Sequence, residues 1–274
     1  MKSSSQHFPV VLLRADRIGE FTEDTYLIRH RHDPDESVGV ALVHLQLESG
    51  SDADKPPVVL IHSAFQNHHC WLGPELNGLG ALLAREGYDV WMMEMRGHGH
   101  SPRNKEFIQT TLERIARYDL PAVAMFVEEK TAQRPVLVGH SAGGVTLATA
   151  VAAGWINADN CQALGLLGTQ IKQRPGYLKV PLSGRGSAKK KDGIDGLYLN
   201  LGPELEPLGV IKEYKSRQGL FGKWRLTGSK DLLNSSWEQA SLPLWGAAGV
   251  SDEFEPYKLC QAFFESYGSA VESE

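Results

Sequence analysis

Ser141 lies in the segment Gly139–Gly143, which reads G-H-S-A-G. A serine hydroxyl is a weak nucleophile until a neighbouring base takes its proton. The G-x-S-x-G pattern is typical of a sharp turn between a strand and a helix, where small residues on both sides of the serine avoid clashes. Because these letters also occur by chance, the surrounding sequence must separate a nucleophile from a serine in an ordinary glycine bend.

The sequence on both sides of Ser141 favours the sharp turn. Residues 135–139 form a short apolar run, and residues 143–154 are apolar enough for a buried helix. The N-terminus of such a helix favours negative charge that develops beside it. We therefore predict that Ser141 is a nucleophile on a strand-to-helix turn.

Short apolar runs recur along the chain, and stretches with helical spacing separate several of them. The expected buried strands are residues 58–61, 90–93, 135–139, 163–169 and 242–250, and residues 79–87 form an expected helix. Residues 38–49 partly alternate apolar and polar side chains, which predicts an antiparallel edge strand. Strands that alternate with helices indicate an α/β fold with a doubly wound, mostly parallel sheet.

Residues 170–240 interrupt this alternation and predict an inserted cap subdomain. The core would then consist of residues 1–169 and an incomplete last part, residues 241–274. The insertion contains a basic, glycine-bearing loop at 183–193, and its lysine run Lys189–Lys191 is expected at a solvated tip. Its aromatic residues are Tyr198, Tyr214, Phe221, Trp224 and Trp237, which we expect to shape an apolar pocket.

Ligands of an open parallel sheet bind beyond the carboxyl ends of its strands. The segments that follow the expected strands read HSA at 62–64, RGHGHS at 96–101, GHSAGG at 139–144 and GVSD at 249–252. Together they resemble the α/β-hydrolase superfamily. The YDLPA segment at 118–122 is similar to that of its lipase-like members, so the resemblance covers most of the chain.

The resemblance implies an oxyanion hole made of two backbone N–H groups. The residue after the nucleophile, Ala142, supplies one, and Ala64 supplies the other, with Phe65 as a neighbouring alternative. Ser63 stands where the family usually has glycine, so the local backbone can differ. His62 would brace this loop and take no part in catalysis.

The family also orders its catalytic residues as serine, acid and histidine, with the acid orienting the histidine. Asp252 follows the last expected strand and is the expected acid. Glu253 and Glu255 are nearby substitutes, and a surface role for all three is the alternative.

None of the ten histidines follows Asp252. Either the chain is a piece of a longer enzyme, or another histidine replaces the missing base. His68 and His69, which follow the oxyanion loop, are the first substitutes, and His98 and His100 the second. They are preferred to His140, which flanks the nucleophile but is expected to point away from the pocket.

We therefore expect a serine hydrolase that cleaves a carboxylic ester through an acyl-enzyme intermediate at Ser141. The alternative is a catalytically silent protein of the same fold that binds a small apolar ligand or a partner. No cofactor is expected. The spacing of His98 and His100 is compatible with metal binding, but the hydrolase loop already explains this segment, so no metal is expected either.

Composition limits the partners further. A net charge of −5 lacks the basic excess that nucleic-acid binding requires. Three separated cysteines without a C-x-x-C motif predict reduced thiols in a cytoplasmic protein. We expect no signal peptide, because the apolar run near the N-terminus is short, and no membrane span. An exposed sheet edge after the last strand would permit a dimer.

Overall fold

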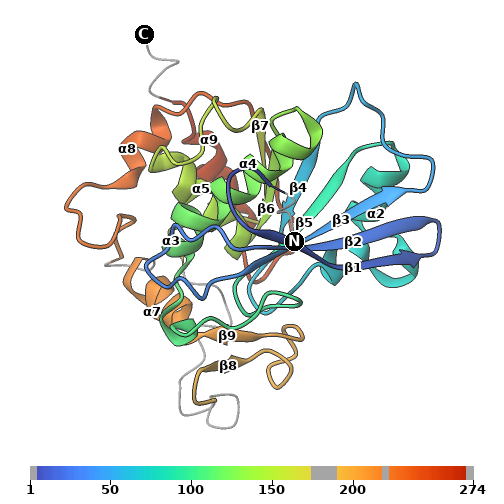
Figure 1. Cartoon of the computed structure of the whole chain (residues 1–274). Coiled ribbons are helices and arrows are strands. Elements are labelled where there is room, and N and C mark those ends of the chain that lie inside the picture. The colour runs from blue at the N-terminus through green and yellow to red at the C-terminus, as the bar shows by residue number, and fades with distance from the viewer. Residues whose placement is uncertain (1–4, 174–189, 218–221, 270–274) are drawn as a thin grey trace.

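The computed structural model describes residues 5–173, 190–217 and 222–269, and within them an eight-stranded sheet forms the centre of the fold (Figure 1). Its strand order is β1-β2-β3-β5-β4-β6-β7-β10. The strands are β1 (Val10–Ile18), β2 (Phe21–Ile28), β3 (Val40–Leu47), β4 (Val58–Ile61), β5 (Val90–Glu94), β6 (Val136–His140), β7 (Ala163–Leu167) and β10 (Leu244–Ala247). From β5 to β10 all neighbours are parallel. The predicted α/β fold with a mostly parallel sheet is confirmed.

The antiparallel side of the sheet differs from the prediction. β3 is not an edge strand, because it lies between β2 and β5 and pairs with both. The hairpin of β1 and β2, which the sequence analysis missed, supplies the edge. Ile18 and Phe21 pair across a two-residue turn that begins with Gly19 at a φ of 59°. A two-residue turn with glycine is a hairpin signal that the sequence does contain.

Helices cover both faces of the sheet. The longer helices are α2 (Leu79–Arg85), α4 (Leu120–Thr131), α5 (Ala142–Ala152), α7 (Leu208–Arg217), α8 (Leu233–Glu238) and α9 (Tyr257–Glu265). Short turns are α1 (His69–Leu72), η1 (Pro74–Leu76), η2 (Phe107–Gln109), α3 (Leu112–Arg114) and η3 (Ile115–Asp119). None of the described helices is long and apolar enough to cross a bilayer.

The apolar core is divided between the two faces. Val59 and Ile61 of β4 join a cluster with α4 and α5, whereas Val58 and Leu60 join a cluster with α1 and α2. Successive strand residues point to opposite faces. A strand buried on both sides therefore reads as a continuous apolar run, which is why β4 was visible in the sequence.

The inserted segment divides into two parts with different neighbours. A short antiparallel pair, β8 (Gly193–Asp195) and β9 (Leu205–Pro207), lies close to the loop after β4, where the Glu204 N–H donates to the Phe65 carbonyl at 3.0 Å. Residues 222–240 instead pack against the core: Trp237 stacks on Phe263 of α9 at 4.7 Å. The cap boundaries at 170 and 240 therefore stay a prediction.

The residues that the sequence analysis singled out in this insertion have different environments. Lys190 and Lys191 are exposed, as predicted, whereas Lys189, Phe221 and most of loop 183–193 lie outside the described residues. Tyr198 is exposed, and Tyr214, Trp224 and Trp237 are buried.

A buried ion network fixes the loop after β5. The Arg96 guanidinium donates to both carboxylate oxygens of Asp119 at 2.7 and 2.6 Å and to Asp33 at 2.8 Å, and all three side chains are inaccessible to solvent. His30 binds the same Asp119 carboxylate at 2.9 Å. Burial alone would raise the pKa of Asp119, but the charge and hydrogen bonds of Arg96 hold this pKa below its usual value. The network ties β5 to the start of α4 and to the loop after β2.

Replacement of Arg96 should show how much this network contributes to the free energy of unfolding. Arg96→Met leaves the buried Asp119 carboxylate without its arginine and removes one of the two arginines that contact Asp33. It should lower the free energy of unfolding by about 3–5 kcal/mol in urea titrations. Arg103→Met, at an exposed position in the same loop, should change it by less than about 1 kcal/mol. Equal effects of the two changes would contradict the role given to the network.

The edge strand β10 offers a surface for self-association. It pairs only with β7 among the described residues, and Trp245 is 59% exposed on it. Unpaired edge strands promote pairing between chains. We expect sedimentation velocity to detect concentration-dependent dimers of this chain that Trp245→Lys abolishes; a monomer at all concentrations would contradict this expectation.

Candidate active site

Ser141 occupies a strained turn between β6 and α5. Its φ of 48° and ψ of −109° lie outside the regions that L-residues favour, and its N–H donates to the Leu167 carbonyl at 2.9 Å. A side-chain carbon at Gly139 would come within 2.7 Å of the Gly143 backbone, and one at Gly143 within 2.3 Å of the Ile61 carbonyl. Both positions therefore require glycine. The predicted turn is confirmed, and the nucleophilic role of Ser141 stays a prediction.

A pocket of about 370 Å³ opens beside this turn. It lies beyond the carboxyl ends of β4 and β6, where the fold predicts a ligand site. Its lining residues are Ser63, Ala64, Phe65, Gln66, Cys70, Trp71, His140, Ser141, Leu201, Asp252, Phe254 and Glu255. Three of the predicted site residues, Ser141, Ala64 and Asp252, therefore share one pocket, and Ala142 adjoins it as the first residue of α5.

The direct partner of Ser141 is Glu255. The Ser141 hydroxyl donates to the Glu255 carboxylate at 2.9 Å, and the Gln170 amide donates to its other oxygen at 2.8 Å. Glu255 is 2% exposed. The sequence predicts Glu255 only as a substitute acid, because nothing in its neighbourhood distinguishes it from the exposed Glu253. Its burial depends on the fold of the loop after β10.

Asp252 organises that loop. Its carboxylate accepts the N–H groups of Phe254 at 2.8 Å and Glu255 at 2.9 Å, so it closes the turn that presents Glu255 to Ser141. No hydrogen bond to a histidine is found for Asp252 among the described residues. Its role as the acid that orients a histidine stays a prediction.

The loop after β4 offers one backbone N–H to the pocket. The Phe65 N–H donates to the Glu206 carboxylate at 2.8 Å and is therefore occupied. The Ala64 N–H has no hydrogen-bond partner within the described residues. Ala142, as the first residue of α5, also carries an N–H that no carbonyl within the helix can accept. This geometry favours Ala64 over Phe65 as the second oxyanion donor.

His62 braces two loops, as predicted. Its Nδ1 lies 2.7 Å from the Ser63 carbonyl, and its Nε2 accepts the Met95 N–H at 3.0 Å. Burial, with the nearby His98, lowers its pKa to about 3. His62 is therefore a neutral structural residue that joins the loops after β4 and β5.

The other histidines do not lie where they were expected. His140 is the only histidine among the described residues that line this pocket. The prediction that His140 points away from the pocket is therefore wrong. Its ring lies edge-on to Trp71, with centroids 6.3 Å apart, and burial lowers its pKa. The proposed substitutes for the base line no part of this pocket: His68 and His100 contact Glu94, and His98 lies 3.8 Å from Glu206.

Two glutamates attach the β8–β9 hairpin to the pocket rim. Glu204 accepts the Asn67 amide at 2.6 Å and the Gly99 N–H at 3.0 Å, while Glu206 holds Phe65, whose φ is 63°. Burial raises the pKa of Glu206 to about 7, and the charge of Glu204 contributes in the same direction. The hairpin thus holds the loop that carries Ala64.

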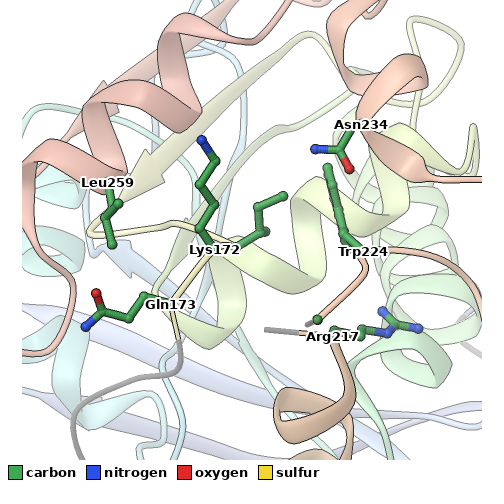
Figure 2. A pocket seen from close by; sticks show the side chains of 8 residues that line it. Lys172, Gln173, Arg217, Trp224, Asn234 and Leu259 are labelled. Atoms are coloured by element: carbon green, nitrogen blue, oxygen red, sulfur yellow. The ribbon is translucent and has the colours of Figure 1, made fainter. Parts of the chain in front are cut away.

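A second cavity of about 480 Å³ lies apart from Ser141 (Figure 2). Ile171, Lys172, Gln173, Arg217, Gly222, Trp224, Asn234 and Leu259 line it. Among the described aromatic residues of the insertion, Trp224 alone lines this cavity. None of Tyr198, Tyr214, Trp224 and Trp237 lines the Ser141 pocket. The expectation that these aromatic residues shape the pocket at Ser141 is therefore wrong for the described ones.

Comparison with known proteins identifies relatives of the chain. The sequence model of the family described as alpha/beta hydrolase fold matches residues 56–199. Lipase member N of Homo sapiens is 34% identical over 131 residues, which are 44% of this chain and 31% of that protein. Gastric triacylglycerol lipase of Homo sapiens is 33% identical over 132 residues, again 44% and 31%. The chain thus matches about a third of the length of these relatives.

Solved structures share the fold. A thermophilic esterase from Thermogutta terrifontis superposes with a TM-score of 0.56 at 18% identity, over 87% of this chain and 85% of the esterase. The monoacylglycerol lipase of Paleococcus ferrophilus gives 0.54 at 17% identity, over 84% of each chain. At these identities the likeness establishes the fold alone.

The raised pKa of Glu206 predicts a pH-dependent stability. Between pH 4.5 and 7 the folded chain holds a proton that the unfolded chain has released, so burial of Glu206 lowers stability as the pH rises. Glu206→Gln removes this loss. The stability of the variant relative to the wild type should therefore increase by about 3 kcal/mol from about pH 5 to about pH 8 in urea titrations.

Glu204→Gln provides the matched control, because it removes a carboxylate near the same strand and leaves the contact with Phe65. Its difference from the wild type should grow much less with pH, because burial remains the larger cause of the raised pKa of Glu206 and the variant removes only the contribution of the Glu204 charge. A difference for Glu206→Gln that stays constant with pH would show that Glu206 is not the titrating group.

Proposed function

Because the chain belongs to the α/β-hydrolase family, we propose that it is a serine hydrolase that cleaves carboxylic esters through an acyl-enzyme intermediate at Ser141. The observation that carries the proposal is the strained turn of Ser141, which aims the hydroxyl into a pocket beside an unoccupied backbone N–H. Backbone strain of this kind persists where the surrounding structure enforces it, and it concentrates at functional sites.

The proposed reaction has two steps. The Ser141 oxygen attacks the ester carbonyl, its proton moves to a nearby acceptor, and the alcohol leaves with a proton. Water then attacks the acyl-serine bond and releases the acid. In both steps the carbonyl oxygen carries negative charge, which the N–H groups of Ala64 and Ala142 would stabilise.

Glu255 is the proposed proton acceptor within this chain. Its carboxylate already accepts the hydrogen bond of Ser141, and Gln170 holds it in place. An ordinary carboxylate is a weaker base than an imidazole. Turnover with Glu255 should therefore be slow compared with that of a serine–histidine pair, and a histidine in a longer protein remains the alternative that the sequence analysis left open.

The pocket favours a small ester. Its volume of about 370 Å³ is at the low end for small-molecule sites. Phe65, Trp71, Leu201 and Phe254 supply apolar surface around Ser141. We propose that the β8–β9 hairpin acts as the cap of this pocket, because Leu201 and the two glutamates of the hairpin contact its rim.

A second function is compatible with one observation. Within the described residues no histidine donates to or accepts from Ser141, and a buried carboxylate fills the place of its partner. A catalytically silent protein that binds a small apolar ligand would have such an arrangement.

A fluorophosphonate probe separates the two functions, because it reacts with activated serines. We expect wild-type protein to be labelled, and Ser141→Ala to lose all labelling. Ser63→Ala is the matched control, since Ser63 lines the same pocket, and it should keep the label. Absence of label on wild-type protein at saturating probe would contradict the hydrolase proposal and favour the silent protein.

Variants of Glu255 test the proton acceptor. Glu255→Gln keeps the shape but is not a base, and should slow labelling by about 10²-fold or more. If Glu255 merely blocks the serine, Glu255→Ala should speed labelling, which would contradict its assignment as the base.

A further inference from the structure

Four ionisable side chains that the proposed reaction does not use meet beyond the carboxyl end of β5. Glu94 ends β5, His100 lies in the loop after it, His68 precedes α1, and Glu23 comes from β2. The possible ligand atoms of His68, Glu94 and His100 lie within 4.8 Å of one another. We call Glu23, His68, Glu94 and His100 the histidine cluster; none of them lines the Ser141 pocket.

Glu94 fixes the orientation of both histidines. Its carboxylate lies 2.6 Å from Nδ1 of His68 and 3.1 Å from Nδ1 of His100, and it also accepts the His100 N–H at 2.6 Å. The Glu94 oxygen accepts a hydrogen bond from Nδ1 of His68, so the neutral imidazole carries its proton on Nδ1.

That proton position leaves Nε2 of His68 as a free lone pair. Nε2 has no hydrogen-bond partner among the described residues, and the same is true of Oε2 of Glu23, 4.0 Å away. The His68 side chain is 1% exposed and that of Glu23 is 8% exposed. Two buried acceptors that face each other without a hydrogen bond are costly.

One cation between these atoms would satisfy both. Zinc binds histidine nitrogen at about 2.0–2.1 Å and carboxylate oxygen at about 2.0–2.2 Å, and its tetrahedral geometry holds two such atoms about 3.4 Å apart. The two atoms, 4.0 Å apart here, would therefore approach each other by about half an ångström when a single ion binds. A carboxylate that orients a ligating histidine through its other nitrogen is also the usual surrounding of a protein-bound zinc. Glu94 has this relation to His68.

We propose that the histidine cluster binds one zinc-like divalent cation through Glu23 Oε2 and His68 Nε2. Nearby imidazoles and water complete the coordination. The Glu23 carboxylate interacts electrostatically with both His69 and His100, and the His69 ring lies 4.0 Å from that of His68. His69 is exposed, so the cluster lies one residue from the surface of the chain.

The ligand types select the metal. Imidazole nitrogen with one carboxylate suits zinc, whereas calcium and magnesium prefer sites made of oxygen. The Arg14 guanidinium contacts Nε2 of His100 at 3.0 Å, but the charge of Arg14 is paired with Asp16 at 2.6 Å.

A bound ion would tie β2 to the loop after β4, four residues from Ala64. The site is therefore structural and independent of the chemistry at Ser141.

The test is the zinc content of the protein. The full chain is treated with a chelator, dialysed against micromolar zinc sulfate and analysed by plasma mass spectrometry. We expect about one zinc per chain in wild-type protein and in Ser141→Ala. Glu23→Gln should bind zinc at least tenfold more weakly, while Glu20→Gln, in the β1–β2 turn, should bind as wild type does.

Melting curves provide a second readout. Zinc should raise the melting temperature of the wild type and of Glu20→Gln but not that of Glu23→Gln, and magnesium should have no effect. If His68→Asn does not fold, Glu23→Gln still decides the question, because the change is nearly isosteric. Less than a fifth of an equivalent of zinc in wild-type protein, or equal binding by Glu23→Gln, would overturn the proposal. The first result would mean that the cluster is held together without a metal, and the second that zinc binds elsewhere on the chain.

Discussion

The rest of the site depends on the close approach of backbone at the Ser141 turn. Gly143 lies so near the Ile61 carbonyl that a side chain at this position would overlap β4. This contact holds the start of α5 against the neighbouring strand, and it forces Ser141 into a positive φ. The parallel pairing of β6 with β4 and with β7 fixes the strand ends between which the turn is held. The loop that carries Ala64 begins at one of those ends, so the same contact sets the distance between serine and oxyanion donor.

The features that sequence predicted are those with local causes. Val58–Ile61 and Val90–Glu94 were visible because burial on both faces demands unbroken apolar runs, and the Ser141 turn because only glycine fits beside it. The β1–β2 hairpin was missed because β1 is mostly exposed and carries charged residues, which weakens the alternating pattern. The wrong prediction that β3 is an edge strand has the same cause, because an edge can be assigned only when all strands of the sheet are known.

The features that sequence could not predict are side-chain contacts between distant segments. Glu255 reaches Ser141 over 114 positions, and Glu206 reaches Phe65 over 141. Neither has a local signature, because a glutamate on an exposed loop and one on a buried loop look alike in one sequence. His140 was misplaced for a related reason: the direction of its ring depends on the space beside Trp71 and Gly168, which the turn alone does not define. The buried acids are therefore the part of the site that the sequence did not reveal, and Glu255 is the one that contacts Ser141.

We propose that Ser141 forms a covalent acyl intermediate, and intact-protein mass spectrometry can detect it. A reaction with p-nitrophenyl butyrate is quenched briefly with acid, and the modified protein is then mapped by peptide. We expect a mass increase of one butyryl group, located on the peptide that contains Ser141, and its absence in Ser141→Ala. Ester turnover without any such adduct, or an adduct that persists in Ser141→Ala, would contradict it.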